Sequence, residues 1–137
     1  MRVVADTNVL ISAFLWSGLP NRLLRLAEEK QITFYTSPAL IEELSGVLTR
    51  PRFVPRFKQL HVTAEELIVD YLALSLLIVP PAIAPVIPED PDDDAVVACA
   101  VAAEARWLIS GDPHLLKLQK YRTTSIVSPA EFFASLK

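Results

Sequence analysis

Four short apolar segments, most of them separated by segments of helical pattern, constrain the fold of this chain more than any other feature. The segments that read as buried strands are residues 2–5, 32–36, 106–110 and 125–127. Helical patterns cover residues 9–16, 21–29, 38–49, 63–77 and 93–105, with a short helix or turn at 53–60 and a terminal helix behind Ser128. Strands that alternate with helices predict a three-layer α/β/α fold, with a central parallel sheet and helices on both faces.

Serine and threonine residues mark where three of these helices begin. Ser37 stands directly before a proline, which is the pattern of an N-cap followed by the first helical position. Thr63 with Glu66, and Ser128 with Glu131, have the spacing of a capping box. The sequence therefore predicts defined helix starts at these three places.

The expected setting is the cytoplasm. The longest uncharged stretch, residues 71–88, contains four prolines and cannot form a membrane-spanning helix. Asp6 interrupts the first apolar run too early for a signal peptide. Cys99 is the only cysteine, so no internal disulfide can form. We expect a cytoplasmic protein without a membrane segment, folded as a single domain over residues 1–137.

The charges are segregated along the chain. The formal net charge of −3 argues against a nucleic-acid-binding protein, whose surface is usually basic. Acidic residues crowd into segment 89–94, whereas four basic residues lie within nine positions, at Arg50, Arg52, Arg56 and Lys58. An acidic centre with this basic flank suits a metal site beside a surface that binds phosphates. An ordinary solvated surface explains the basic residues equally well.

Two aspartates follow predicted strands. Asp6 comes directly after segment 2–5, and Asp112 follows segment 106–110 in a Gly-Asp-Pro turn. Ligands of open parallel sheets bind at the carboxyl ends of the strands, so these two side chains are expected to meet. Each also has a structural explanation, Asp6 as a helix cap and Asp112 as a turn residue. Asn8 could cap the helix instead, which would free Asp6 to face a cleft.

Helical geometry separates Glu43 from its neighbour Glu42. Five residues form one apolar stripe on this helix: Leu40, Ile41, Leu44, Val47 and Leu48. At about 100° per residue, Glu43 lies at the border of that stripe and Glu42 points away from it. Glu43 can therefore reach a cleft, although a surface ion pair would also account for it.

Four of the five residues 90–94 are aspartates at the start of a predicted helix. One or two acids complement a helix macrodipole, by up to about 1 kcal/mol each. A larger number calls for another partner, and a bound cation is the simplest one. Asp93 precedes an almost wholly apolar helix, which draws it toward the interior.

Converging carboxylates would require a divalent ion. Two of them about 4 Å apart repel by about 4 kcal/mol at an effective dielectric constant of 20. Oxygen ligands without histidine or thiolate partners select Mg²⁺ or Mn²⁺ over zinc. An ion held in this way can activate water against a phosphodiester. The sequence contains no competing Ser-His-Asp set, glycine-rich phosphate loop or Cys-His pair.

Four motifs, in order along nearly the whole chain, resemble those of the PIN-domain family. They are Val-Val-Ala-Asp-Thr-Asn-Val-Leu-Ile-Ser at 3–12, Ser-Pro-Ala-Leu-Ile-Glu-Glu-Leu at 37–44, Asp-Pro-Asp-Asp-Asp at 90–94 and Leu-Ile-Ser-Gly-Asp at 108–112. The chain is most similar to bacterial VapC-type toxins of toxin–antitoxin systems. The resemblance implies an Mg²⁺- or Mn²⁺-dependent endoribonuclease, a homodimer, and a cognate antitoxin that blocks the site.

The resemblance also assigns residues. The acids that it implies for the metal site and catalysis are Asp6, Glu43, Asp93 and Asp112. Thr7 and Asn8 match the polar residues that orient the first acid, and Asp90 and Asp93 match the family's Asp-Pro-x-Asp pattern. We assign Asp93 as the ligand, with Asp90 or Asp94 as outer ligands. Family members often carry a second acid after Gly-Asp, where this chain has His114. This departure affects the fourth ligand position of the metal site.

Other functions remain open from the sequence. A haloacid-dehalogenase-like phosphatase needs a second aspartate where this chain has Asn8. A response-regulator receiver needs a lysine directly after a late strand, and none follows residues 107–110 before Lys117. A non-catalytic RNA- or protein-binding module on the same fold is an alternative, as is a metal-dependent nuclease acting on DNA. The apolar helix 63–77 is a candidate dimer surface, but core packing explains its composition equally well.

Overall fold

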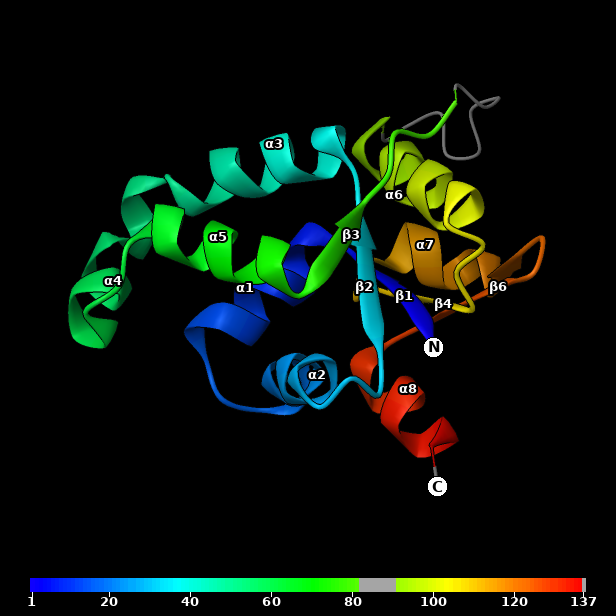
Figure 1. The fold of residues 1–137 in the computed structure, drawn as a ribbon, viewed down its shortest axis with the longest axis horizontal. Coiled ribbons are helices and arrows are strands. Elements are labelled where there is room, and N and C mark those ends of the chain that lie inside the picture. Colours follow the sequence, from blue (N-terminus) through cyan, green and yellow to red (C-terminus); the bar gives the residue numbers. More distant parts are fainter. Residues whose placement is uncertain (82–90, 137) are drawn as a thin grey trace.

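The protein is described by a computed structural model over residues 1–81 and 91–136 (Figure 1). The strands are β1 Arg2–Ala5, β2 Thr33–Thr36, β3 Ser75–Leu77, β4 Trp107–Ile109, β5 Lys120–Tyr121 and β6 Thr124–Val127. The helices are α1 Thr7–Leu15, α2 Leu19–Glu28, α3 Pro38–Leu48, a 3₁₀ turn Pro51–Phe53, α4 Val54–Leu60, α5 Ala64–Ala73, α6 Pro91–Ala102, α7 Pro113–Leu118 and α8 Pro129–Ser135. The predicted caps at Ser37, Thr63 and Ser128 all accept a hydrogen bond from the first turn of their helix.

One mostly parallel sheet joins the six strands in the order β3-β2-β1-β4-β6-β5. Among the strand pairs of residues 1–81 and 91–136, only the short pair β5–β6 is antiparallel. From β1 the chain first builds outward through β2 and β3, and it then returns to place β4 on the other side of β1. The gap beyond the carboxyl ends of β1 and β4 is thus the topological switch point, where open parallel sheets bind ligands.

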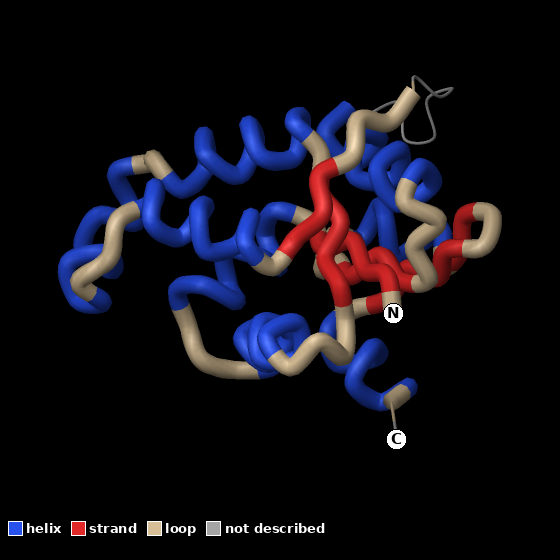
Figure 2. Tube along the Cα trace, viewed as in Figure 1, coloured by secondary structure: helices blue, strands red, loops and turns tan. Residues whose placement is uncertain are grey.

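Successive side chains of the strands pack into two separate hydrophobic cores, one on each face of the sheet. Val3 and Ala5 point into a core with α1, α2, α5 and α8, whereas Val4 points into a second core with α6 and α7. Figure 2 shows helices on both sides of the strands. The predicted α/β fold, with a central parallel sheet covered on both faces, is confirmed.

The predicted helix 63–77 is wrong at its end. Helix α5 ends at Ala73, where the Leu74 amide and the Ser75 hydroxyl both bond to the Tyr71 carbonyl oxygen. After Leu74, residues Ser75–Leu77 form β3, in which Leu76 pairs with Tyr35 of β2. An edge strand of three residues is too short to show the two-residue periodicity of a strand. Its apolar residues therefore look like a continuation of the preceding helix.

Helix α7 and strand β5 were not predicted at all. The Gly-Asp-Pro sequence that ends β4 also starts α7, because Asp112 caps this helix and Pro113 is its first residue. Arg122, with φ of 53°, lies in the tight turn between β5 and β6. None of the helices in the described parts of the chain has the length and apolar character needed to cross a bilayer.

Candidate active site

The parallel register brings Asp6 and Ser110 to the same point of the sheet edge. Ala5 of β1 pairs with Ile109 of β4, so the next residue of each strand leaves the sheet beside the other. The Asp6 amide still donates to the Ile109 carbonyl oxygen, at 3.0 Å. An aspartate and a serine therefore lie next to each other at the topological switch point.

Asp6 is both a helix cap and part of this edge. Its Oδ1 accepts a hydrogen bond from the Val9 amide at 3.0 Å, which caps α1, and its Oδ2 accepts one from the Ser110 hydroxyl. The alternative in which Asn8 caps the helix is wrong, because Asn8 is already the second residue of α1. A carboxylate has about four acceptor sites on its two oxygens, so these two bonds leave acceptor capacity toward the cleft. Asp6 is only 5 % exposed.

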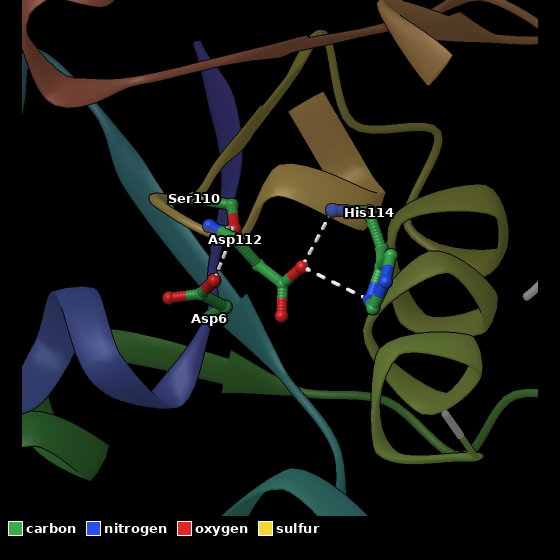
Figure 3. Close-up of polar contacts among 4 residues, drawn as sticks. All are labelled: Asp6, Ser110, Asp112 and His114. Atoms are coloured by element: carbon green, nitrogen blue, oxygen red, sulfur yellow. Dashed lines mark hydrogen bonds and ion pairs between the residues drawn. The ribbon is translucent and has the colours of Figure 1, made fainter. Parts of the chain in front are cut away.

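Ser110 is a site residue that the sequence interpretation missed. Its buried hydroxyl donates to Asp6 and accepts a hydrogen bond from the Asp112 amide at 2.9 Å (Figure 3). It thereby links the aspartates that follow β1 and β4. The only signal in the sequence was its place as the last residue of a predicted strand, in the Ser-Gly-Asp motif.

Asp112 lies between Asp6 and His114 (Figure 3). Its Oδ1 accepts a hydrogen bond from the His114 amide at 2.7 Å, and the Nδ1 atom of the His114 ring is 3.6 Å from the same oxygen. Asp93, Asp112 and His114 each offer one ligand atom, and these atoms lie within 4.8 Å of one another. This group places a histidine nitrogen beside the carboxylate oxygens that the sequence predicts as ligands.

Two helices complete the arrangement. A small pocket of about 30 Å³ is lined by Asp6, Thr7, Asn8, Glu43, Asp93, Val96 and Asp112. We call it the acidic pocket. Glu43 reaches it from α3 while Glu42 is exposed, as the helical geometry predicted. Asp93 is buried near the start of α6, and Asp94 is half-buried beside it. Asp90 lies outside the described residues.

Burial raises the pKa of Asp6 above its ordinary value of 3.8. The hydrogen bonds from Ser110, Val9 and Gly111 lower the pKa, whereas the negative charge of Asp112 raises it further. The interior thus disfavours the charged form of Asp6 unless a positive charge is nearby. A cation in the pocket would supply that charge.

Two larger cavities lie away from these acids. One of about 380 Å³ is lined by parts of α2, β2, α5 and β3, and one of about 470 Å³ lies along α5 beside Glu65, Glu66 and Asp70. The acids of the second cavity are exposed on a single helix, where water solvates them. Convergence of buried titratable groups is the better guide to a reactive site than cavity volume.

The basic flank, defined as Arg50, Arg52, Arg56 and Lys58, does not line the acidic pocket. It follows the end of α3 and continues onto α4, which Figure 1 places at the opposite end of the molecule from α6 and α7. Arg56 donates to the Leu15 carbonyl oxygen at 2.6 Å and lies over the Trp16 ring. Arg56 therefore connects α4 to the end of α1, which is a structural role.

Comparisons with known proteins match the chain to a family model, a related sequence and a solved structure. The sequence model of one family, described as PIN domain, matches residues 2–114. An uncharacterized protein of Methanocaldococcus jannaschii, MJ1680, is 29 % identical over 120 residues, which cover 87 % of this chain and 76 % of the other. The fold is similar to that in a crystal structure of VapBC2 from Rickettsia felis bound to a DNA fragment from their promoter. The TM-score is 0.57 at 15 % identity, covering 92 % of this chain and 97 % of the other.

Proposed function

The chain belongs to the PIN domain family, and from this premise we propose that it is a divalent-metal-dependent endoribonuclease that hydrolyses RNA phosphodiester bonds at the acidic pocket. PIN domains are generally nucleases that use a divalent metal. The observation that carries the proposal is the convergence of four acids from separate elements on one pocket: Asp6, Glu43, Asp93 and Asp112.

The residues at the pocket fit a divalent ion. A volume of about 30 Å³ exceeds what one water needs, so an ion with part of its hydration shell has room. Carboxylate oxygens are the ligands that Mg²⁺ and Mn²⁺ prefer. The raised pKa of Asp6 marks a site where negative charge lacks compensation. When bound, such an ion would activate water and offset the charge that develops on the phosphodiester.

The roles of the chain's own groups follow from their contacts. Asp6 is held rigid by Val9 and Ser110, so its carboxylate has one orientation toward the pocket. Asp112 is held in the same way by the His114 amide. We assign Glu43 and Asp93 as the ligands that close the pocket from the helices. In hydrolysis the water oxygen bonds to phosphorus, one ester P–O bond breaks, and the leaving oxygen takes a proton.

Residues around these acids complete the proposal. Thr7 and Asn8 line the pocket and would orient Asp6 or the substrate. Asp94 is proposed as an outer ligand, and Asp90 keeps that role as a prediction from the sequence alone. The whole chain, residues 1–137, is proposed to act as a single nuclease domain.

Partners are proposed on the fold similarity to VapBC2 and on exposed apolar side chains. We propose that a cognate antitoxin blocks the acidic pocket and that the protein acts in the cytoplasm as a homodimer. Val69 and Leu72 on α5, with Leu76 and Leu77 on the neighbouring strand β3, are all exposed, and α5 packs against β3. This surface is the candidate dimer interface. If this surface forms the dimer, the variant Val69→Glu should be monomeric by light scattering.

The test of the function is cleavage of single-stranded and structured RNA with Mg²⁺ or Mn²⁺, with DNA of the same sequence in parallel. Asp6→Asn keeps the helix cap, because asparagine caps as well as aspartate does, but removes the charge. We expect wild-type protein to cut RNA and Asp6→Asn to be inactive. Equal cutting by both proteins would point to contamination. Preferential cutting of DNA would show that the substrate is DNA and not RNA. Binding of RNA without cutting would favour a non-catalytic module.

A further inference from the structure

We propose that His114 is a direct ligand of the ion, together with Asp93 and Asp112, and that its imidazole makes the centre prefer Mn²⁺ over Mg²⁺. This inference rests on the proposed function, because it concerns the metal of the same site. In the sequence, His114 stands only as the replacement of an expected acid. The structure assigns it a position among the ligand atoms.

Distances support one shared ion. An octahedral ion with bonds of about 2.1 Å holds its ligand atoms roughly 3 Å apart when adjacent and roughly 4 Å apart when opposite. The ligand atoms of Asp93, Asp112 and His114 all lie within 4.8 Å of one another. Small rotations of these side chains therefore suffice to bring all three onto one ion.

The start of α7 fixes His114 in this place. Asp112 caps the helix by accepting from the His114 amide at 2.7 Å, so the backbone of His114 is tied to a carboxylate of the acidic pocket. The same bond brings the ring toward the Asp112 carboxylate, with Nδ1 at 3.6 Å from Oδ1 (Figure 3). The His114 side chain is 54 % exposed, so it can turn onto an ion without disturbing the core.

A simple ion pair with Asp112 is the competing explanation. An ion pair as exposed as this one contributes about 0 to 1 kcal/mol, which is little reason for a histidine at the rim of a carboxylate pocket. An ion pair between Asp112 and His114 would also not explain why a ligand atom of Asp93 lies within 4.8 Å of both. Coordination accounts for all three side chains together.

The chemistry of imidazole then determines which ion is preferred. Mg²⁺ binds oxygen ligands and water, whereas imidazole nitrogen is a ligand for first-row transition ions. Exchanging a carboxylate for an imidazole also reduces the negative charge of the site, which weakens Mg²⁺ most because its binding is mainly electrostatic. The site should therefore bind Mn²⁺ more tightly than Mg²⁺.

The test uses Mn²⁺ as the probe, because its electron spin reports directly bound nitrogen. The chain has two histidines, His61 and His114, so an imidazole signal has only two possible sources in protein prepared without a histidine tag. The control variant is His61→Asn. His61 has φ of 56° at the end of α4, a left-handed conformation that asparagine tolerates.

We expect pulsed electron paramagnetic resonance to detect imidazole nitrogen on Mn²⁺ in the wild-type protein and in His61→Asn. His114→Gln should lose that coupling and bind Mn²⁺ about tenfold more weakly, with a smaller loss for Mg²⁺. His114→Asp restores an acid at this position, so it should lose the nitrogen coupling yet bind Mg²⁺ more tightly than the wild-type protein does. It also provides the same spectroscopic test if His114→Gln fails to fold.

Bound Mn²⁺ without imidazole coupling in the wild-type protein would overturn the inference, as would coupling that persists in both His114 variants. If RNA is still cut in either case, the proposed function stands and only the role of His114 falls. Coupling without RNA cleavage would keep the ligand and overturn the ribonuclease. Absence of any Mn²⁺ binding to the wild-type protein would overturn both.

Discussion

The acidic pocket and the basic flank are both clusters of like charge, but the chain builds them in opposite ways. The pocket gathers side chains from the start of α1, just beyond β1, from α3 and α6, and from the turn after β4, and Asp6 and Asp93 within it are buried. The flank comes from one continuous stretch, and three of its four side chains are exposed. Converging buried charges require a counter-ion, whereas exposed charges need only water. Convergence of buried charges in space, rather than density of charge along the chain, is therefore the better indication of a candidate reactive site.

The largest expected effect separates two adjacent acids of α3. Glu43→Gln should reduce RNA cleavage by about 10²- to 10³-fold, the loss typical of one electrostatic contact in an active site. Glu42→Gln should leave the rate unchanged, because Glu42 is exposed outside the pocket. Initial rates at saturating Mn²⁺ measure both. Equal losses in the two variants would show that the charge of α3 matters and the pocket does not.

The basic flank is tested next, through stability. Arg56→Ala should lower the free energy of unfolding by about 2 kcal/mol, because it removes the bond to the Leu15 carbonyl oxygen and the contact with Trp16. Lys58→Ala, at an exposed position of the same helix, is the matched control. Urea unfolding gives both values. If Arg56→Ala is as stable as Lys58→Ala, the flank has no structural role.

Asp6 should show a smaller effect with a characteristic pH dependence. Because its pKa is raised in the folded state, the protonated form favours folding. This contribution is fully present below the unfolded pKa near 3.8 and is lost as the pH rises through the folded value. In EDTA at neutral pH, Asp6→Asn should therefore melt a few degrees above the wild-type protein, and the gap should close toward acid pH.

Thermal scans across that pH range measure the gap. An asparagine at this position can still cap α1, so loss of the helix cap does not obscure the result. A variant that is less stable than the wild-type protein at every pH would mean that the buried carboxylate is already compensated without an ion.

The smallest effect concerns RNA affinity. If Arg50 and Lys58 each bind a phosphate, replacing both by alanine reduces the slope of log affinity against log salt by about 0.7 for each phosphate that is no longer neutralised. Fluorescence anisotropy with the uncut complex of Asp6→Asn measures this slope. An unchanged slope would show that these two residues do not bind RNA phosphates.

The fold and the acids were predictable from the sequence because their signals are local. Short apolar strands, proline after Ser37 and capping boxes define the elements, and the rule on strand ends connects Asp6 with Asp112. Glu43 followed from helical geometry. None of these steps needed the neighbour order of the strands.

What could not be predicted depends on that order or on very short elements. The bridge through Ser110 requires β1 and β4 to be neighbours in one register. The place of His114 depends on α7, a helix of six residues that is too short for a periodic pattern. The position of the basic flank was predicted wrongly. Its four basic residues are close together in the sequence, which suggested that they lie beside the acids, but the fold places them away from the acidic pocket (Figure 1).

The central claim is that the acids of the pocket share a divalent ion. The most direct measurement is the thermal midpoint of the wild-type protein in EDTA and in excess Mn²⁺, with Asp93→Asn in parallel. An ion present at 100 times its Kd stabilises the folded state by about 2.7 kcal/mol, which corresponds to a rise on the order of 10 °C. We predict that rise for the wild-type protein and its loss in Asp93→Asn. Identical wild-type midpoints in EDTA and in Mn²⁺ would contradict the account.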